Sequence, residues 1–327
     1  MATSALSIDH QAERQQHSRN LVDTVVLVGG MTLLTASAAV LILGWLGLLL
    51  AVLAVGLLAM AAPNVPPSYV MGLYRATAMD RRNGRDVYLI LNELVARAGM
   101  AHTPTLHVVP SLTLNAFSVG TPDRAAIAIT EGLLRRLTLR QMAGVLAHEL
   151  SHIRNNDLRL LALADAMTRV MQLLSWLGLA LVVYYLPQYV QGNTRIPWAG
   201  AFLLYLAPML STLLQLALSR TREFDADIDA VGLTGDSEGL ASALGDIERN
   251  QGKIWEDLVF PNSRRTLEPS LLRSHPATPD RLSRLADVRS PIGESPMVIG
   301  AESPRVSLVG MAPSAMRPRY RFPGLWF

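Results

Sequence analysis

Three stretches of the chain are strongly apolar, and polar segments separate them. No charged residue occurs from Thr24 to Ala62, a run too long for one membrane crossing, which takes about 20 residues. A break at Gly44–Gly47 would divide this run into two helices in a tight hairpin. Val170–Val190 and Ile196–Ser219 are also uncharged, and a turn-rich link joins them. The pattern therefore predicts four transmembrane helices in two hairpins.

The second pair has an alternative interpretation. Gln172, Pro208 and Gln215 interrupt its apolar character, so these helices are also compatible with the buried core of a large soluble domain. Tyr184, Tyr185, Tyr189 and Trp198 cluster where an interfacial aromatic belt would lie, which favours membrane helices.

The polar segment between the two hairpins carries signals for a small folded domain. Asp86–Ala98 repeats its apolar residues at helical spacing, and Gly99 is placed to end that helix. Short runs rich in strand-forming residues predict three strands: Thr105–Val109, Asn115–Val119 and Ala125–Ile129. The fold class predicted is mainly α, α+β: transmembrane helices plus a cytosolic domain with a small sheet. A strand of that sheet could accept an extended peptide.

A helix is expected next, over Thr138–Asp157. Thr138 and Gln141 have the spacing of a capping box, and apolar residues follow at helical intervals. Gly144 lies inside the helix, where glycine costs about 1 kcal/mol relative to alanine. Its presence there indicates a closely packed neighbour.

This helix contains the pattern H-E-x-x-H. His148 and His152 are four residues apart, so they project from the same face and can bind one metal ion. Glu149 is turned by about 100° from His148, which lets it face a water molecule without binding the metal. The chain has no cysteine, so a thiolate site is excluded. Imidazole and carboxylate ligands with one open position suit catalytic zinc.

A third ligand is needed, and the acidic segment after the last apolar stretch can supply it. On a helix Glu223 and Asp227 share one face, while Asp225 and Asp229 share another. Spacing alone cannot choose between Glu223 and Asp227, and a solvated acidic helix face is an equal alternative. Asn155 and Leu158 stand where the longer motif requires glycine and a third histidine, which argues against that class.

Charge indicates how the chain lies in the membrane. The net charge is +3, and no phosphate-binding glycine loop or nucleic-acid motif is present, so nucleic acid is not an expected partner. Arginines flank the apolar stretches at one end of each hairpin: Arg14, Arg19, Arg75, Arg81, Arg82, Arg85, Arg154, Arg159, Arg169, Arg220 and Arg222. The hairpin links carry only Arg195. By the positive-inside rule, both termini and the H-E-x-x-H helix face the cytoplasm.

Five segments together resemble the HtpX-type membrane metalloproteases, relatives of the CAAX prenyl proteases in the gluzincin group. In chain order they are NAFSVG, ITEGLLRRLT, LAHELSHIRNND, SRTREFDADIDA and SHPATPDRL. The resemblance runs from about Tyr69 to Val288. It implies a zincin-like catalytic domain, one zinc ion per chain and polypeptide substrates, and it suggests a bacterial inner membrane.

The resemblance also implies roles for individual residues. It makes His148, His152 and Glu223 the zinc ligands and Glu149 the general base. It suggests that Asp227 orients a ligand histidine. Asn115 would lie in the strand that holds the substrate backbone, and His275 or Arg281 would stabilise the oxyanion. Read without the family, Asn115, His275 and Arg281 are ordinary turn, loop and surface residues.

The chain is thus divided into an arm (1–20), a hairpin (21–62), a first catalytic part (63–169), a second hairpin (170–219), a second catalytic part (220–290) and a disordered tail (291–327). The function expected is zinc-dependent proteolysis of membrane proteins, misfolded or damaged ones, at the cytosolic face. Two alternatives remain, a CAAX-type prenyl-protein protease and a non-catalytic membrane scaffold that keeps zinc for structure. The sequence does not indicate cleavage preference or oligomeric state.

Overall fold

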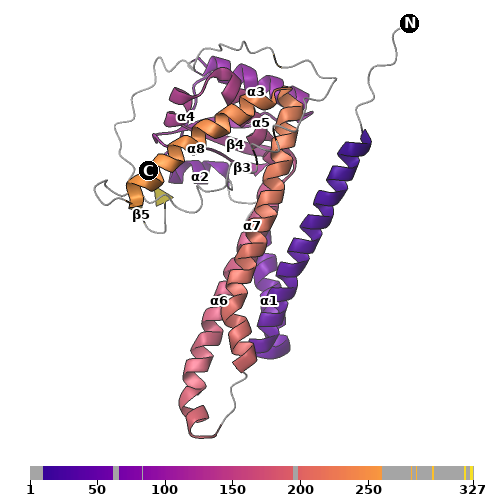
Figure 1. The fold of residues 1–327 in the computed structure, drawn as a ribbon, viewed down its shortest axis with the longest axis vertical. Helices are drawn as coiled ribbons and strands as arrows, with labels where there is room; N and C mark the ends of the chain where they lie inside the picture. Colours follow the sequence, from indigo (N-terminus) through magenta and orange to yellow (C-terminus); the bar gives the residue numbers. More distant parts are fainter. Residues whose placement is uncertain are drawn as a thin grey trace. The chain divides into compact units, whose positions relative to one another are not determined.

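The computed structural model describes residues 10–61, 66–82, 84–193, 198–259, 281, 285, 297, 320–321 and 325–326 (Figure 1). The chain divides into two compact units. The first comprises Met1–His10, Val65–Leu158 and Arg222–Phe327. The second comprises Gln11–Asn64 and Arg159–Thr221. The second unit is therefore built from two separate stretches of the sequence.

A four-stranded sheet lies in the first unit. Its strands are β1 (Thr77–Ala78), β2 (Thr105–Val109), β3 (Ala116–Thr121) and β4 (Arg124–Thr130). Their order is β1-β2-β4-β3, with β2 parallel to β4 and the other pairs antiparallel. Strand β3 is thus at one edge of the sheet. The three strands predicted from the sequence are present, and β1 is an addition.

Helices cover both faces of this sheet. On one face α2 (Pro67–Leu73) packs with Met71 and the side chains of Val109, Ala126 and Ala128. The other face joins the main core, formed with α3 (Arg85–Arg97), α4 (Glu131–Arg136), α5 (Leu139–Arg154) and α8 (Ser237–Val259). Leu106, Ile127 and Ile129 of the sheet are fully buried there. This core fixes α5, the H-E-x-x-H helix, against the sheet.

Local signals explain where these helices begin and end. The Thr130 side chain accepts a hydrogen bond from the Leu133 backbone and caps α4. Helix α3 ends before Gly99, whose φ of 64° is the left-handed conformation usual after a helix. Thr138 and Gln141 form both bonds of a capping box at the start of α5.

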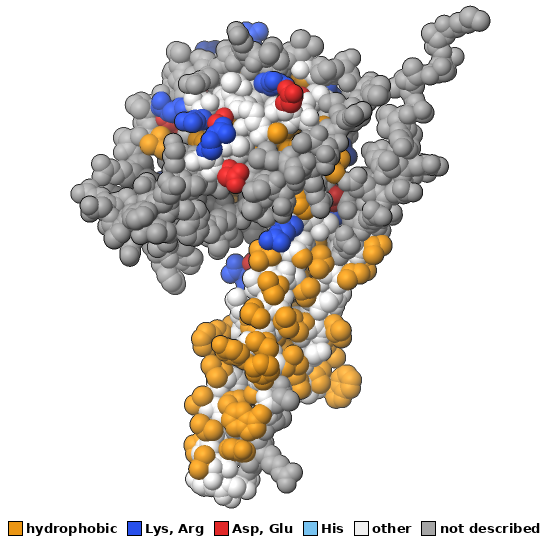
Figure 2. Space-filling view, viewed as in Figure 1, with side chains coloured by type: hydrophobic (Ala, Val, Ile, Leu, Met, Phe, Trp, Pro, Cys, Tyr) orange, Lys and Arg blue, Asp and Glu red, His pale blue; other side chains and the backbone are white. Residues whose placement is uncertain are grey.

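The second unit is helical and apolar. It contains most of α1 (His10–Ala61), α6 (Asp157–Val190) and α7 (Trp198–Thr234). Three described helical stretches are long and apolar enough to cross a membrane: Thr24–Leu57, Asp157–Val190 and Gly200–Thr234. Figure 2 shows hydrophobic side chains spread over these helices. Trp176, Phe202 and Tyr205 are among the large hydrophobic residues that are exposed. An apolar surface of this extent is typical of lipid-facing helices.

Helix α1 is interrupted at Gly44, where φ is 61° and ψ is −143°. A side chain added to Gly47 would collide with the carbonyl group of Ala39. In an unbroken helix these two residues would be about 12 Å apart along the axis. The chain therefore turns sharply here, within the Gly44–Gly47 segment where the sequence predicted a break.

The two predicted end segments are described only in part. The polar arm expected over residues 1–20 is helical from His10 onward, because α1 begins there. Most of the tail expected to be disordered lies outside the described residues. Within it, Tyr320–Arg321 and Leu325–Trp326 pair as two short antiparallel strands, β5 and β6. The Met297 backbone donates to the Thr234 carbonyl at 2.9 Å.

Candidate metal centre

Helix α5 presents two histidines to one point inside the first unit. His148 and His152 are one turn apart and only 4% and 5% exposed. Their Nε2 atoms are 3.2 Å from each other. At this distance the N–H of one imidazole can donate to the bare nitrogen of the other, and a metal ion bound by both nitrogens would bring them equally close.

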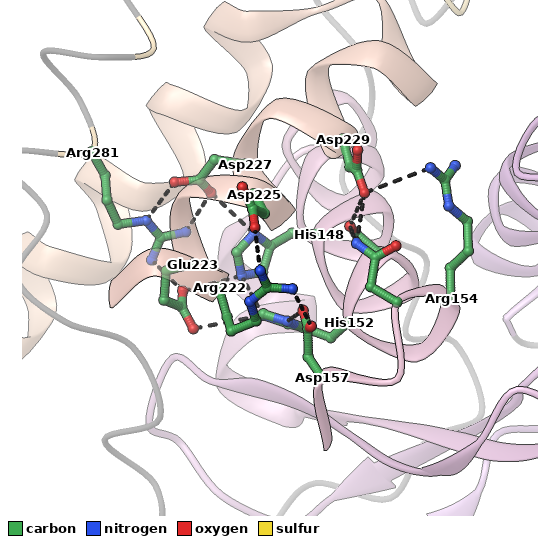
Figure 3. Close-up of polar contacts among 12 residues, drawn as sticks. His148, His152, Arg154, Asp157, Arg222, Glu223, Asp225, Asp227, Asp229 and Arg281 are labelled. Carbon is green, nitrogen blue, oxygen red and sulfur yellow. Dashed lines mark hydrogen bonds and ion pairs between the residues drawn. The ribbon is translucent and has the colours of Figure 1, made fainter. Parts of the chain in front are cut away.

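The third member of the group comes from α7. Glu223 is 2% exposed, and its two carboxylate oxygens lie 3.4 Å from Nε2 of His148 and 3.6 Å from Nε2 of His152. One ligand atom from each of the three residues lies within 4.8 Å of the others, the only such metal-binding group among the residues that the structure describes (Figure 3).

The distance of 3.2 Å between the two Nε2 atoms fits a tetrahedral metal site. Ligand atoms at zinc's usual bond lengths of 2.0–2.1 Å are about 3.3 Å apart when the geometry is tetrahedral. The charge around the histidines also favours a cation. Burial by itself lowers the pKa of His152, but the carboxylates of Asp157, Glu223 and Glu149 outweigh burial and raise that pKa to about 10. The site therefore holds a positive charge readily.

A second layer of charged groups surrounds the ligands. Nδ1 of His148 lies 3.0 Å from Oδ1 of Asp227. Arg281 donates two hydrogen bonds to the Asp227 carboxylate, at 2.7 and 2.6 Å, and its third nitrogen is 3.2 Å from Glu223. Arg281 is 2% exposed, so it is an interior residue and not the helix-surface charge that the sequence alone suggests. Figure 3 shows its guanidinium group turned toward both acidic residues.

Asp157 and Arg222 also enter this layer, and the sequence interpretation assigned neither a role. Oδ2 of Asp157 is 3.0 Å from Nδ1 of His152. Arg222 donates to Oδ1 of Asp157 at 3.3 Å and pairs with Asp225 at 2.9 Å. The sequence does contain one indication of their position, the Asn-Asn-Asp segment that follows the helix. Asparagine tolerates the left-handed backbone conformation in which a chain can turn after a helix.

A separate polar cluster ties α5 to α7. Asp229 accepts hydrogen bonds from Ser151 and Asn155, each at 2.8 Å. Arg154 is 3.7 Å from the same carboxylate. These contacts hold the two ligand-bearing helices together without touching either histidine.

The other predicted site residues are placed as follows. Glu149 is 2% exposed on α5. Asn115 directly precedes the edge strand β3, and its backbone nitrogen donates to the Thr130 hydroxyl at 3.0 Å. His275 lies outside the described residues. The structure thus brings His148, His152, Glu223, Asp227 and Arg281 together.

The sequence of this chain matches the family model for peptidase family M48 over residues 81–289, which include every residue of this centre. The chain belongs to peptidase family M48. Its members are metallopeptidases, so the histidine–carboxylate group has the composition that the family requires.

Two curated relatives match this chain along nearly their whole length. A "Protease HtpX homolog" from Acaryochloris marina is 33% identical over 296 residues, which is 85% of this chain and 98% of the relative. "Protease HtpX" from Legionella pneumophila (strain Corby) is 30% identical over 285 residues, 81% of this chain and 98% of the relative. The crystal structure of S. mikatae Ste24p matches 83% of this chain and 66% of its own, with 20% identity and a TM-score of 0.47.

The expected family and fold class are therefore confirmed: the chain is an HtpX-type membrane metalloprotease with a small mixed sheet. Its substrates are polypeptides, and its apolar helices lie in a lipid bilayer. The roles of the individual residues remain predictions.

Proposed function

We propose that this protein is a zinc-dependent endopeptidase that cleaves membrane proteins at the cytosolic face of the membrane. The observation that carries the proposal is the buried group of His148, His152 and Glu223, whose ligand atoms are spaced for a tetrahedral ion. Zinc is favoured over harder ions, because two of the three donors are imidazole nitrogens.

The chain's own residues would divide the remaining work. His148, His152 and Glu223 would hold the ion, which supplies Lewis acidity to a peptide carbonyl and makes water nucleophilic near neutral pH. Glu149 would take a proton from the attacking water as oxygen bonds to the carbonyl carbon. It would then deliver that proton to the amine as the carbon–nitrogen bond breaks. Arg281 or His275 would stabilise the oxyanion formed in between.

The sheet offers a way to hold the substrate. Strand β3 is at the edge of the sheet and packs against α5, and Asn115 directly precedes it. An edge strand has unpaired backbone groups, to which an extended peptide can bind as an added strand. Such binding recognises the backbone of the substrate more than its side chains, which suits an enzyme that acts on many different misfolded proteins.

The membrane topology belongs to the same proposal. The turn at Gly44 would split the first apolar stretch into two crossings, which gives four spans with α6 and α7. The arginine distribution supports an orientation with both termini and the metal centre on the cytosolic side. This arrangement would be that of a bacterial inner-membrane protease engaged in protein quality control.

The test is Glu149→Gln in the full chain, purified in detergent and compared with wild type for casein cleavage and zinc content. Loss of a general base costs about 100-fold or more in rate, so cleavage should fall at least that far while zinc content stays the same. Glu93→Gln is the control, since Glu93 is half exposed and its carboxylate pairs with Arg97 on the same helix, α3. Wild-type cleavage by Glu149→Gln would disprove the proposal. Cleavage of a prenylated peptide in preference to casein would instead favour the CAAX-type alternative.

A further inference from the structure

The link between α5 and α6 is unusually short and is bent in a specific way. Asn155 ends α5, Asn156 adopts a positive φ of 57°, and Asp157 already begins α6. Asparagine tolerates this left-handed conformation better than other residues that carry a side chain, apart from aspartate. In an unbroken helix, His152 and Asp157 would be about 140° apart around the axis and could not meet. The bend at Asn156 brings them together.

The carboxylate of Asp157 has a partner on each oxygen. It is 1% exposed, with Oδ2 3.0 Å from Nδ1 of His152 and Oδ1 3.3 Å from Nη1 of Arg222. Nη2 of Arg222 is in turn 2.9 Å from Asp225 (Figure 3). A buried carboxylate is stable only when donors of this kind surround it. Arg222 therefore pairs with one oxygen of Asp157 and leaves the other oxygen facing the histidine.

The geometry of His152 gives this contact a function. Nε2 of His152 faces His148 and Glu223, at 3.2 and 3.6 Å, so Nδ1 points away from the metal centre toward Asp157. A histidine that binds metal through Nε2 carries its proton on Nδ1, and a carboxylate acceptor there fixes the tautomer and the ring orientation. Nδ1 of His148 likewise lies 3.0 Å from Oδ1 of Asp227, a distance close enough for an ion pair but without hydrogen-bond geometry. Each histidine therefore has its own carboxylate.

We propose that Asp157 is the positioning residue for His152, and that Arg222 holds Asp157 in place for this task. The inference rests on the proposed zinc site. The two residues also have a special place in the chain, because the segment Arg159–Thr221 of the second unit is inserted between them. Their ion pair closes the base of that insertion within the first unit.

The experiment measures zinc affinity by competition with a chromophoric chelator, using the full chain in detergent. Loss of a carboxylate behind a ligand histidine weakens metal binding by about 10–100-fold. Asp157→Asn should show a loss in this range, and Asp227→Asn should show a similar one. The matched control is Asp229→Asn, because Asp229 also joins α5 to α7 by hydrogen bonds but touches neither histidine. Its zinc affinity should stay within about threefold of wild type, since no outer contact of a ligand is removed.

A second readout does not depend on activity. With cobalt in place of zinc, the visible absorption bands should shift in Asp157→Asn and not in Asp229→Asn, because only the first change alters a ligand histidine. Equal zinc affinity and equal cobalt spectra in the two variants would overturn the inference. If Asp157→Asn does not fold, Arg222→Gln decides: weaker zinc binding supports the inference and unchanged binding overturns it. Wild type that binds no zinc would instead refute the zinc site itself, and this inference with it.

Discussion

Gly144 offers a sharp test of how the metal-binding helix is held. An added Cβ there would lie 2.9 Å from Cα of Leu240 and 3.1 Å from both its nitrogen and its Cβ. Two of these are backbone atoms of α8, which cannot move aside as the end of a side chain can. Gly144 therefore marks a close approach of α5 to α8, one turn before His148.

Two opposing effects set the outcome of Gly144→Ala. Alanine gains about 1 kcal/mol over glycine from helix propensity. Forcing an extra carbon into a packed interior costs about 1–3 kcal/mol. Because the clash is with backbone, we expect the upper part of that range and a net loss of about 1–2 kcal/mol in the free energy of unfolding.

The control is Gly245→Ala on α8. Its added Cβ would meet only Nη1 of Arg249, at 3.6 Å, which is an ordinary contact with a flexible side chain. This variant keeps the propensity gain and should be more stable than wild type. Thermal unfolding of the full chain, in the same detergent for all three proteins, measures the difference. If Gly144→Ala raised the unfolding temperature as much as Gly245→Ala does, the close packing of α5 against α8 would be refuted.

Two further predictions concern charge and metal. Asp236 accepts hydrogen bonds from Arg140 at 2.6 and 2.7 Å and from the Gly239 backbone at 3.0 Å. Burial by itself raises the pKa of Asp236, but these partners outweigh it and lower that pKa below its usual value of about 3.9. A lowered folded-state pKa stabilises above the unfolded value, so the stability advantage of wild type over Asp236→Asn should hold from about pH 5 to 8 and shrink below about pH 4. An advantage that grew with acid in thermal unfolding would contradict this. Glu223→Ala should lose most of its zinc in elemental analysis, since it removes one of three ligands; full zinc content would show that Glu223 is not a ligand.

Much of the first unit could be predicted from sequence because its signals are local. The capping box of Thr138 and Gln141, the cap at Thr130 and the helix end at Gly99 each depend on residues within four positions. Such contacts form in the same way wherever the helix is packed. The close approach at Gly144 was inferable for a related reason, since only a packed neighbour compensates for glycine in a helix.

The choice between Glu223 and Asp227 could not be made from spacing. Both lie on one face of α7, and their roles depend on how α7 crosses α5. That crossing is determined by contacts between residues that are far apart in the sequence. In the structure Glu223 reaches the Nε2 atoms of both histidines, while Asp227 reaches Nδ1 of His148. The role of Asp157 could not be predicted from spacing, because its contact with His152 depends on the left-handed turn at Asn156. Helical periodicity alone puts the two residues on different faces.

The most direct test of the central claim is X-ray absorption at the zinc edge of the purified full-length protein. The account predicts one zinc per chain with two imidazole nitrogens in its first shell, a carboxylate oxygen and no sulfur. The distances should be about 2.0–2.2 Å, as is usual for these ligands. A protein that takes up no zinc when zinc is supplied, or zinc without histidine in its first shell, would contradict the account.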